Sequence, residues 1–95
     1  MASSSEAFEK FSTWKNAKTS LKVTVIIKGK TDDVLVGWKI FGVDSDASQI
    51  GFFNPSVMHS SVVFDVEDST FSIEPSRLVA TRNESDWIIF EESED

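Results

Sequence analysis

The sequence has 95 residues, no cysteine, and 16 acidic against 9 basic residues, which gives a formal net charge of −7. A chain of this length forms one domain, and without cysteine it can form neither a disulfide nor a thiolate metal site. No apolar run reaches the roughly 18 residues of a membrane span, and the start of the chain lacks the basic and apolar blocks of a signal peptide. We therefore expect a single domain over residues 1–90, located in the cytoplasm, with no membrane partner.

Charge is distributed unevenly along the chain. Residues 1–39 carry seven lysines against four acidic residues, or +3, whereas residues 40–95 carry two arginines against twelve acidic residues, or −10. Such asymmetry arises when a basic helix and first strand face an acidic sheet, and it can also mark a charged partner. The overall acidity does not favour nonspecific phosphate binding, which needs a dense Lys/Arg surface, so no DNA partner is expected.

Residues 3–18 are predicted to form a helix. Ser3 and Glu6 have the spacing of a capping box, and acidic residues come first and lysines last, as the helix macrodipole favours. Three aromatic residues recur at every third position and form one apolar stripe: Phe8, Phe11 and Trp14. This spacing is more typical of a helix that covers a sheet than of a ligand platform, so we expect the helix to cap the core.

Residues 21–43 are predicted to form a β-hairpin around which the rest of the chain is organised. In residues 21–27 apolar and polar residues alternate, the pattern of a strand with one solvated face. Residues 29–33 contain a glycine and two aspartates, which favour a turn. Residues 34–43 are apolar on both faces except at Lys39, so this strand is expected to be covered on both sides.

Further short strands are predicted after this hairpin, separated by polar turns: 49–53, 57–66, 71–73, 78–81 and 87–90. Residues 91–95 form an acidic tail that is predicted to be disordered. The expected fold class is therefore mainly β: an N-terminal helix followed by a five- to seven-stranded antiparallel small barrel or rolled sheet.

No catalytic constellation is recognisable in the sequence. His59 is the only histidine; Ser60 and Ser61 follow it, but neighbouring residues on a strand point to opposite faces and form no relay. Residues 44–48 begin like a calcium loop, yet Gln49 stands where such a loop needs glycine. We therefore expect no enzyme, no catalytic residue, no metal and no cofactor.

Trp38 and Trp87 are the better candidates for binding. Trp38 lies in a predicted strand between Gly37 and Lys39, and Trp87 opens the last predicted strand. An exposed ring at either position would stack a base or anchor a peptide, whereas a buried ring would belong to the core.

The stretch from Gly37 to Ser48 resembles the first motif of the Sm/LSm family. In that motif a strand glycine is followed by Gly-Phe-Asp, with an asparagine four residues after the aspartate. Here Gly37 is followed by Gly42-Val43-Asp44, and Ser48 stands in the asparagine position. The sequence departs from the family in its spacing, which is one residue longer from glycine to aspartate, and in the valine that replaces the phenylalanine.

A second segment is similar to the family's second motif. The hydrophobic strand 78–81 ends in Arg82-Asn83, where the family has Arg-Gly, and a hydrophobic final strand follows. The resemblance implies a bent small barrel that assembles into rings and binds single-stranded RNA. It also implies four residues near a bound base: Asp44, Ser48, Arg82 and Asn83.

Three functions are compatible with these observations. The first is a non-enzymatic interaction module that binds a protein partner through a sheet edge or an aromatic patch. The alternative is an Sm-like oligomeric RNA-binding protein, for which solution mass and RNA titration are decisive. The third is a binder of small hydrophobic ligands, which would need a partly unfilled interior. The sequence leaves the partner's identity and the oligomeric state open.

Overall fold

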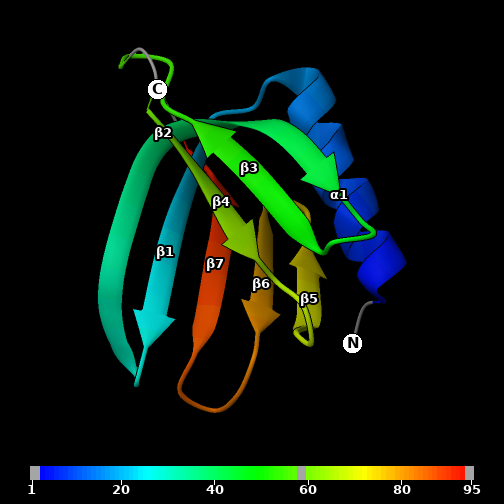
Figure 1. Ribbon diagram of the computed structural model, residues 1–95, viewed down its shortest axis with the longest axis vertical. Helices are drawn as coiled ribbons and strands as arrows, with labels where there is room; N and C mark the ends of the chain where they lie inside the picture. The colour runs from blue at the N-terminus through cyan, green and yellow to red at the C-terminus, as the bar shows by residue number, and fades with distance from the viewer. Residues whose placement is uncertain (1–2, 58–59, 94–95) are drawn as a thin grey trace.

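A computed structural model describes residues 3–57 and 60–93 of the chain (Figure 1). The predicted fold class is confirmed: one N-terminal helix precedes seven antiparallel strands that form one sheet. Their bounds are α1 Ser4–Ala17, β1 Leu21–Ile27, β2 Lys30–Asp44, β3 Gln49–Phe53, β4 Ser61–Asp65, β5 Thr70–Glu74, β6 Arg77–Thr81 and β7 Trp87–Glu92.

The sheet has the strand order β4-β3-β2-β1-β7-β6-β5, so β4 and β5 are consecutive in the chain but lie at opposite edges. Within the described residues no pairing joins these two edges, and the sheet is therefore rolled without closing into a barrel. Of the two shapes expected from the sequence, the rolled sheet is the one observed.

Aromatic rings fill the interior of the roll. Phe52 of β3 stacks on Phe90 of β7, with ring centroids 5.8 Å apart, so the two halves of the sheet face each other. Phe11 of α1 meets Phe90 edge-on at 5.0 Å, and Phe8 meets Phe71 of β5 at 6.4 Å. The predicted role of the helix is confirmed, because its apolar stripe is buried against the sheet.

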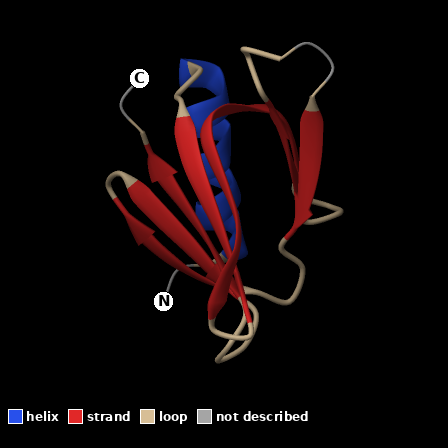
Figure 2. Cartoon of the chain, turned by 90° about the vertical axis from the view of Figure 1, so that its left-hand side faces the viewer, coloured by secondary structure: helices blue, strands red, loops and turns tan. Residues whose placement is uncertain are grey.

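Strand β2 joins the two halves of the sheet. Its first part pairs with β1 and its second part with β3, and Figure 2 shows the curve that this exchange of partners requires. The register shifts where Val36 and Trp38 face successive residues of β1, which leaves Gly37 as the extra residue of a bulge with a φ of 75°. A bulge that begins with a left-handed glycine bends a strand and increases its twist.

The expectation that residues 34–43 are covered on both sides is wrong. Val36 is 63% exposed and Phe41 is 51% exposed. The reason is architectural: the helix and the facing strands cover only the inner side of the rolled sheet, so alternate residues of β2 point outward. The turn before β2 is also shorter than expected, because Lys28 and Gly29, both with positive φ, suffice to reverse the chain.

The ends of two predicted elements also differ. The strand expected over 57–66 is observed as Ser61–Asp65, and residues 58–59 of that prediction lie outside the described part. The tail expected over residues 91–95 is wrong for Glu91 and Glu92, which belong to β7 opposite Lys22 and Leu21 of β1, and residues 94–95 of that prediction lie outside the described part. The place of Glu91 and Glu92 in the sheet is stabilised by strand pairing and by the indole N–H of Trp14, which donates to the carboxylate of Glu92 at 3.2 Å.

Within residues 3–57 and 60–93, no helix has the length and apolar character needed to cross a membrane.

Candidate functional site

Strand β4 has one paired side and one open side. Two hydrogen bonds fix its alignment with β3, from Asn54 N–H to the Ser60 carbonyl at 3.0 Å and from Val66 N–H to the Ser48 carbonyl at 2.8 Å. Hydrogen-bonded pairs alternate along an antiparallel ladder, so the even-numbered residues of β4 bond to β3. The odd-numbered residues therefore turn their peptide N–H and C=O groups toward the side that has no neighbouring strand in the described chain.

An exposed aromatic ring lies on the outer face of the sheet, over the strand next to β4. Phe41 is half-exposed and lies against Gly51 of β3, where an added Cβ atom would come within 2.4 Å of the ring. Gly51 is opposite Gly42 on one side and Val63 of β4 on the other, and the side chain of Val63 is 54% exposed. We call this outer surface, formed by Phe41, Gly51 and Val63, the Phe41 platform.

Two hollows flank the platform and share Phe41 as a wall. One, of about 240 Å³, continues over residues 42–44, Gln49 and Gly51 to Val63. The other runs toward the loop before β4 and includes Pro55, Val57 and Ser60. The platform is therefore a raised ring between two depressions, a shape that a side chain of a partner can fill on either side.

Acidic residues border one end of the platform. Asp44, Gln49 and Asp65 lie opposite one another across β2, β3 and β4 on its outer face. The Asp44 carboxylate accepts hydrogen bonds from the N–H groups of Asp46 and Ala47, both at 3.1 Å, which stabilises the loop. At the other end, Lys39 lies opposite Phe53.

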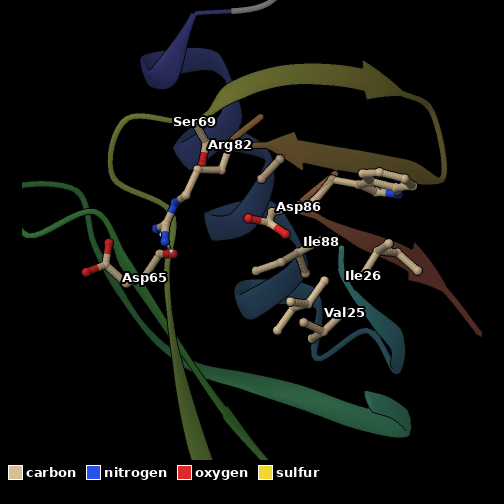
Figure 3. Close-up of a pocket in the computed structure, with 10 residues that line it drawn as sticks. Val25, Ile26, Asp65, Ser69, Arg82, Asp86 and Ile88 are labelled. Atoms are coloured by element: carbon tan, nitrogen blue, oxygen red, sulfur yellow. Dashed lines mark hydrogen bonds between the residues drawn. The ribbon is translucent and has the colours of Figure 1, made fainter. Parts of the chain in front are cut away.

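A second feature, which we call the end pocket, lies at the end of the roll that the helix leaves uncovered. It has a volume of about 190 Å³ and is mostly apolar. Its lining comes from β1, the end of β4 and the turn after it, β6, β7 and the β6–β7 loop: Val25, Ile26, Ile27, Asp65, Ser69, Ala80, Arg82, Asp86, Trp87 and Ile88. Figure 3 shows Val25 and Ile88 close together beneath Asp86, whereas the side chain of Ile26 is directed away from them.

Arg82, which follows β6, reaches across to the edge strand β4. Its Nη2 donates to the backbone carbonyl of Asp65 at 3.2 Å, and this bond uses one of the five donors of the guanidinium. The Asp65 carboxylate accepts from the N–H of Glu67 at 2.9 Å, and in Figure 3 it is turned away from the pocket.

Asp86 is held by hydrogen bonds within the loops. Its carboxylate accepts from the backbone N–H of Lys28 at 3.0 Å and from the side-chain amide of Asn83 at 2.9 Å. The Lys28 N–H, followed by the Asn83 amide and the charge of Arg82, lowers the pKa of Asp86 below its ordinary value, because each of them favours the ionised carboxylate. The bond to Lys28 ties the β6–β7 loop to the β1–β2 turn.

The two candidate tryptophans are half-buried. Trp38 packs against the hydrophobic core from β2, and Trp87 opens β7 opposite Ile26 and Thr81. The aromatic residue that the described structure exposes is Phe41, which was not among the residues predicted from the sequence. Its signal is the cross-strand pair Gly42–Gly51, which becomes visible only when the strand register is known.

The four residues suggested by the Sm-like resemblance lie at one end of the roll. Asp44 and Ser48 bound the β2–β3 loop, and Arg82 and Asn83 begin the β6–β7 loop. Asp65 connects the two groups, since it lies next to Gln49 of β3 and accepts the bond from Arg82.

Two of these side chains are engaged in their own loops. The Asn83 side-chain oxygen accepts from the N–H groups of Ser85 and Asp86, at 2.9 and 3.0 Å. The Asp44 carboxylate is bound in the β2–β3 loop by the N–H groups of Asp46 and Ala47. These hydrogen bonds stabilise turns, so a ligand would have to compete with them.

No protein family model matches the sequence, and no curated protein or solved structure matches it either. In the part of the chain that the structure describes, no group of three or more His, Cys, Asp or Glu side chains is arranged to hold a metal ion.

Proposed function

We propose that this protein is a non-enzymatic protein-binding module that adds an extended segment of its partner to the open edge of β4. The observation that carries the proposal is the position of Ser61 and Val63, whose peptide groups face the open edge, while the exposed ring of Phe41 lies over the adjacent strand β3. In this mode of recognition, main-chain hydrogen bonds supply affinity and side-chain hollows supply specificity.

The opposite edge of the sheet is less suited to such a partner. The outward side chains of β5 are polar and exposed: Thr70, Ser72 and Glu74. Helix α1 also packs beside this strand through the contact of Phe8 with Phe71. Polar and covered edges resist strand addition, whereas β4 has the Phe41 platform next to its open side.

Charge and geometry define the partner. Asp44 and Asp65 border one end of the platform, and the protein carries a net charge of −7, so a basic segment is attracted. At the end of β4, the Asp65 carbonyl also faces the open side, but it already accepts a hydrogen bond from Arg82. The partner strand therefore pairs with Ser61 and Val63 and continues toward the exposed Val57. We expect an extended segment that alternates apolar residues with polar ones and carries Lys or Arg.

Selection from a phage-displayed library of random peptides tests this proposal. We expect the selected peptides to have that alternating, basic pattern. Ser61→Pro removes one outward N–H at the first residue of an edge strand, where proline is tolerated, and Ser61→Ala is the matched control that keeps it. We expect Ser61→Pro and Phe41→Ser to weaken binding by about tenfold, and Ser61→Ala to change it by less than about twofold.

Two results would contradict the proposal. One is a selected peptide that binds the Ser61→Pro and Phe41→Ser variants as tightly as the parent protein, while thermal melting shows that both variants are folded. The other is a selection that yields no peptide with an extended alternating pattern.

The competing proposal is an Sm-like RNA-binding protein. One observation favours it: the four residues given by the resemblance, Asp44, Ser48, Arg82 and Asn83, lie at the same end of the roll. It predicts a ring in solution by light scattering and a tryptophan fluorescence change on titration with single-stranded RNA at low salt. A monomer with a flat titration eliminates it.

A further inference from the structure

We propose that the end pocket binds a small aromatic carboxylate, with the ring against Val25, Ala80 and Ile88 and the carboxylate on Arg82. This site is distinct from the β4 edge and does not depend on the function proposed above. Its walls come from strands that are far apart in the sequence, so the pocket forms only when the sheet is folded.

The size and lining of the pocket favour a single ring. Its volume is about 190 Å³ and its surface is mainly apolar. An engineered apolar cavity of about 150 Å³ is large enough to bind benzene. Val25, Ala80 and Ile88 lie on the inner side of neighbouring strands, since Val25 is opposite Ile88 and Ile88 is opposite Ala80. They form a continuous aliphatic wall against which a ring can lie.

The polar rim favours an anionic head group. Asp86 is already compensated by the Lys28 N–H and the Asn83 amide, and the Asp65 carboxylate is bonded to its own loop. Arg82 donates one hydrogen bond, to the Asp65 carbonyl, and its charge also acts on the Asp86 carboxylate. No other hydrogen bond joins its remaining donors to the described residues. A guanidinium with free donors pairs readily with a carboxylate, in a bidentate geometry when both oxygens are reached.

The orientation of these groups is consistent with this assignment. Figure 3 shows the guanidinium of Arg82 on one side of the pocket and the Asp86 carboxylate on another, with Val25 and Ile88 below. A ligand seated on the aliphatic wall therefore reaches Arg82 at the rim. An amine in the same place would have to share Asp86 with the Lys28 N–H and the Asn83 amide, from which the carboxylate already accepts.

Benzoate is the probe for this site, followed by NMR on the methyl groups of the full chain. We expect saturable shifts of the Val25, Ala80 and Ile88 methyl groups with a Kd of about 1 mM, as befits a ligand of this size. Benzylamine, of the same size and opposite charge, should bind at least about tenfold more weakly.

Three variants test whether benzoate binds in the end pocket and through Arg82. Arg82→Gln should weaken benzoate binding by about tenfold, whereas Lys22→Gln, a charge removal on the outer face, should leave it unchanged. Ile27→Trp, at an exposed position on the rim, should block the pocket. Phe41→Ser, the variant expected to weaken peptide binding, serves as a further control and should not affect benzoate.

The proposal is overturned by any of three results. These are benzylamine binding as tightly as benzoate, an unchanged benzoate affinity in folded Arg82→Gln protein, or shifts that map to the Phe41 platform in place of the end pocket. If Arg82→Gln does not fold, Ile27→Trp decides, because retention of benzoate binding in that variant also refutes the site.

Discussion

Gly51 determines where the ring of Phe41 lies. Because glycine has no side chain, the ring rests on the backbone of β3, and a methyl group there would overlap it. The ring is half-exposed, so it can move outward at little cost. A substitution at Gly51 therefore changes the binding surface without changing the core.

We predict that Gly51→Ala displaces the Phe41 ring and weakens peptide binding by several fold, while the free energy of unfolding changes by less than about 1 kcal/mol. Gly42→Ala is the matched control, since an added Cβ at Gly42 meets no atom within 4 Å. Peptide titration and urea unfolding of both variants measure the two effects. Equal peptide affinity in the parent and Gly51→Ala proteins would show that the ring position is irrelevant.

Asp86 couples the stability of the fold to pH. The Lys28 N–H holds the pKa of Asp86 below the ordinary value of an aspartate. The ionised carboxylate therefore stabilises the folded state at pH values above the ordinary pKa of an aspartate. This contribution is lost as the pH falls through the lower pKa that Asp86 has in the folded state. The ionised form of Asp86 therefore stabilises the junction of the two loops at neutral pH.

We predict that Asp86→Asn lowers the free energy of unfolding at pH 7 and that the difference from the parent protein narrows as the pH falls below ~4. Asp46→Asn, in an exposed loop position, is the control and should show neither effect. Urea unfolding at a series of pH values measures both. A constant difference between Asp86→Asn and the parent at every pH would contradict this role.

Which aromatic ring is exposed could not be predicted from the sequence. Tryptophan often anchors a bound peptide or base, which makes Trp38 and Trp87 the candidates from sequence. The exposure of a ring on a strand, however, depends on which side of the sheet is covered. Phe41 is itself the extra residue of a bulge between the pairs Ile40–Phe52 and Gly42–Gly51, and its ring lies over a glycine of the next strand. Neither the bulge nor the cross-strand neighbour is encoded in the local pattern of apolar residues.

Strand β2 is the element that gives the sheet its shape. It leaves β1 at the bulge and continues with β3, and Gly37 has the positive φ that this geometry uses. A residue with a Cβ atom in the left-handed region costs about 1–2 kcal/mol. Gly37 is therefore one position that encodes the bend, together with the bulge at Phe41 where β2 pairs with β3.

We predict that Gly37→Ala destabilises the protein by about 1–2 kcal/mol, measured by urea unfolding. Gly42→Ala, on the same strand without a positive φ, should change stability by less than about 0.5 kcal/mol. Similar effects of the two substitutions would show that the bend does not depend on the backbone conformation of Gly37.

Helix α1 begins at a capping box that was predicted from sequence and is confirmed. The Ser3 hydroxyl accepts from the Glu6 N–H at 3.2 Å, and the Glu6 carboxylate reaches back to the Ser3 N–H. We predict that Ser3→Ala lowers the free energy of unfolding by about 1 kcal/mol. Ser5→Ala, at an exposed position in the first turn, is the control, and an equal loss there would refute the role of the cap.

At the scale of the whole molecule, the sequence allowed the order of the elements to be predicted because each has its own local signal. The period of the aromatic stripe identified α1, and alternation with intervening polar turns identified the strands. Closure of the sheet could not be predicted, because it depends on whether β4 and β5 meet, a long-range property. The open edge, on which the proposed function depends, follows from that missing pairing.

The uneven charge of the chain has a partial explanation in this arrangement. Lys22 of β1 lies opposite Glu91 of β7, so part of the basic first segment does face the acidic last strand. Asp44 and Asp65, however, border the Phe41 platform on the outer face and have no such basic strand opposite them. This is the charge that we assign to recognition of a basic partner segment.

Amide hydrogen exchange of the protein with a selected peptide bound tests whether the partner segment pairs with β4. Strand addition to β4 predicts that the amides of Ser61 and Val63 become protected by about tenfold or more, while those of β5 are unchanged. Unchanged exchange at Ser61 and Val63, with the peptide bound at saturation, would show that the edge of β4 is not the binding site.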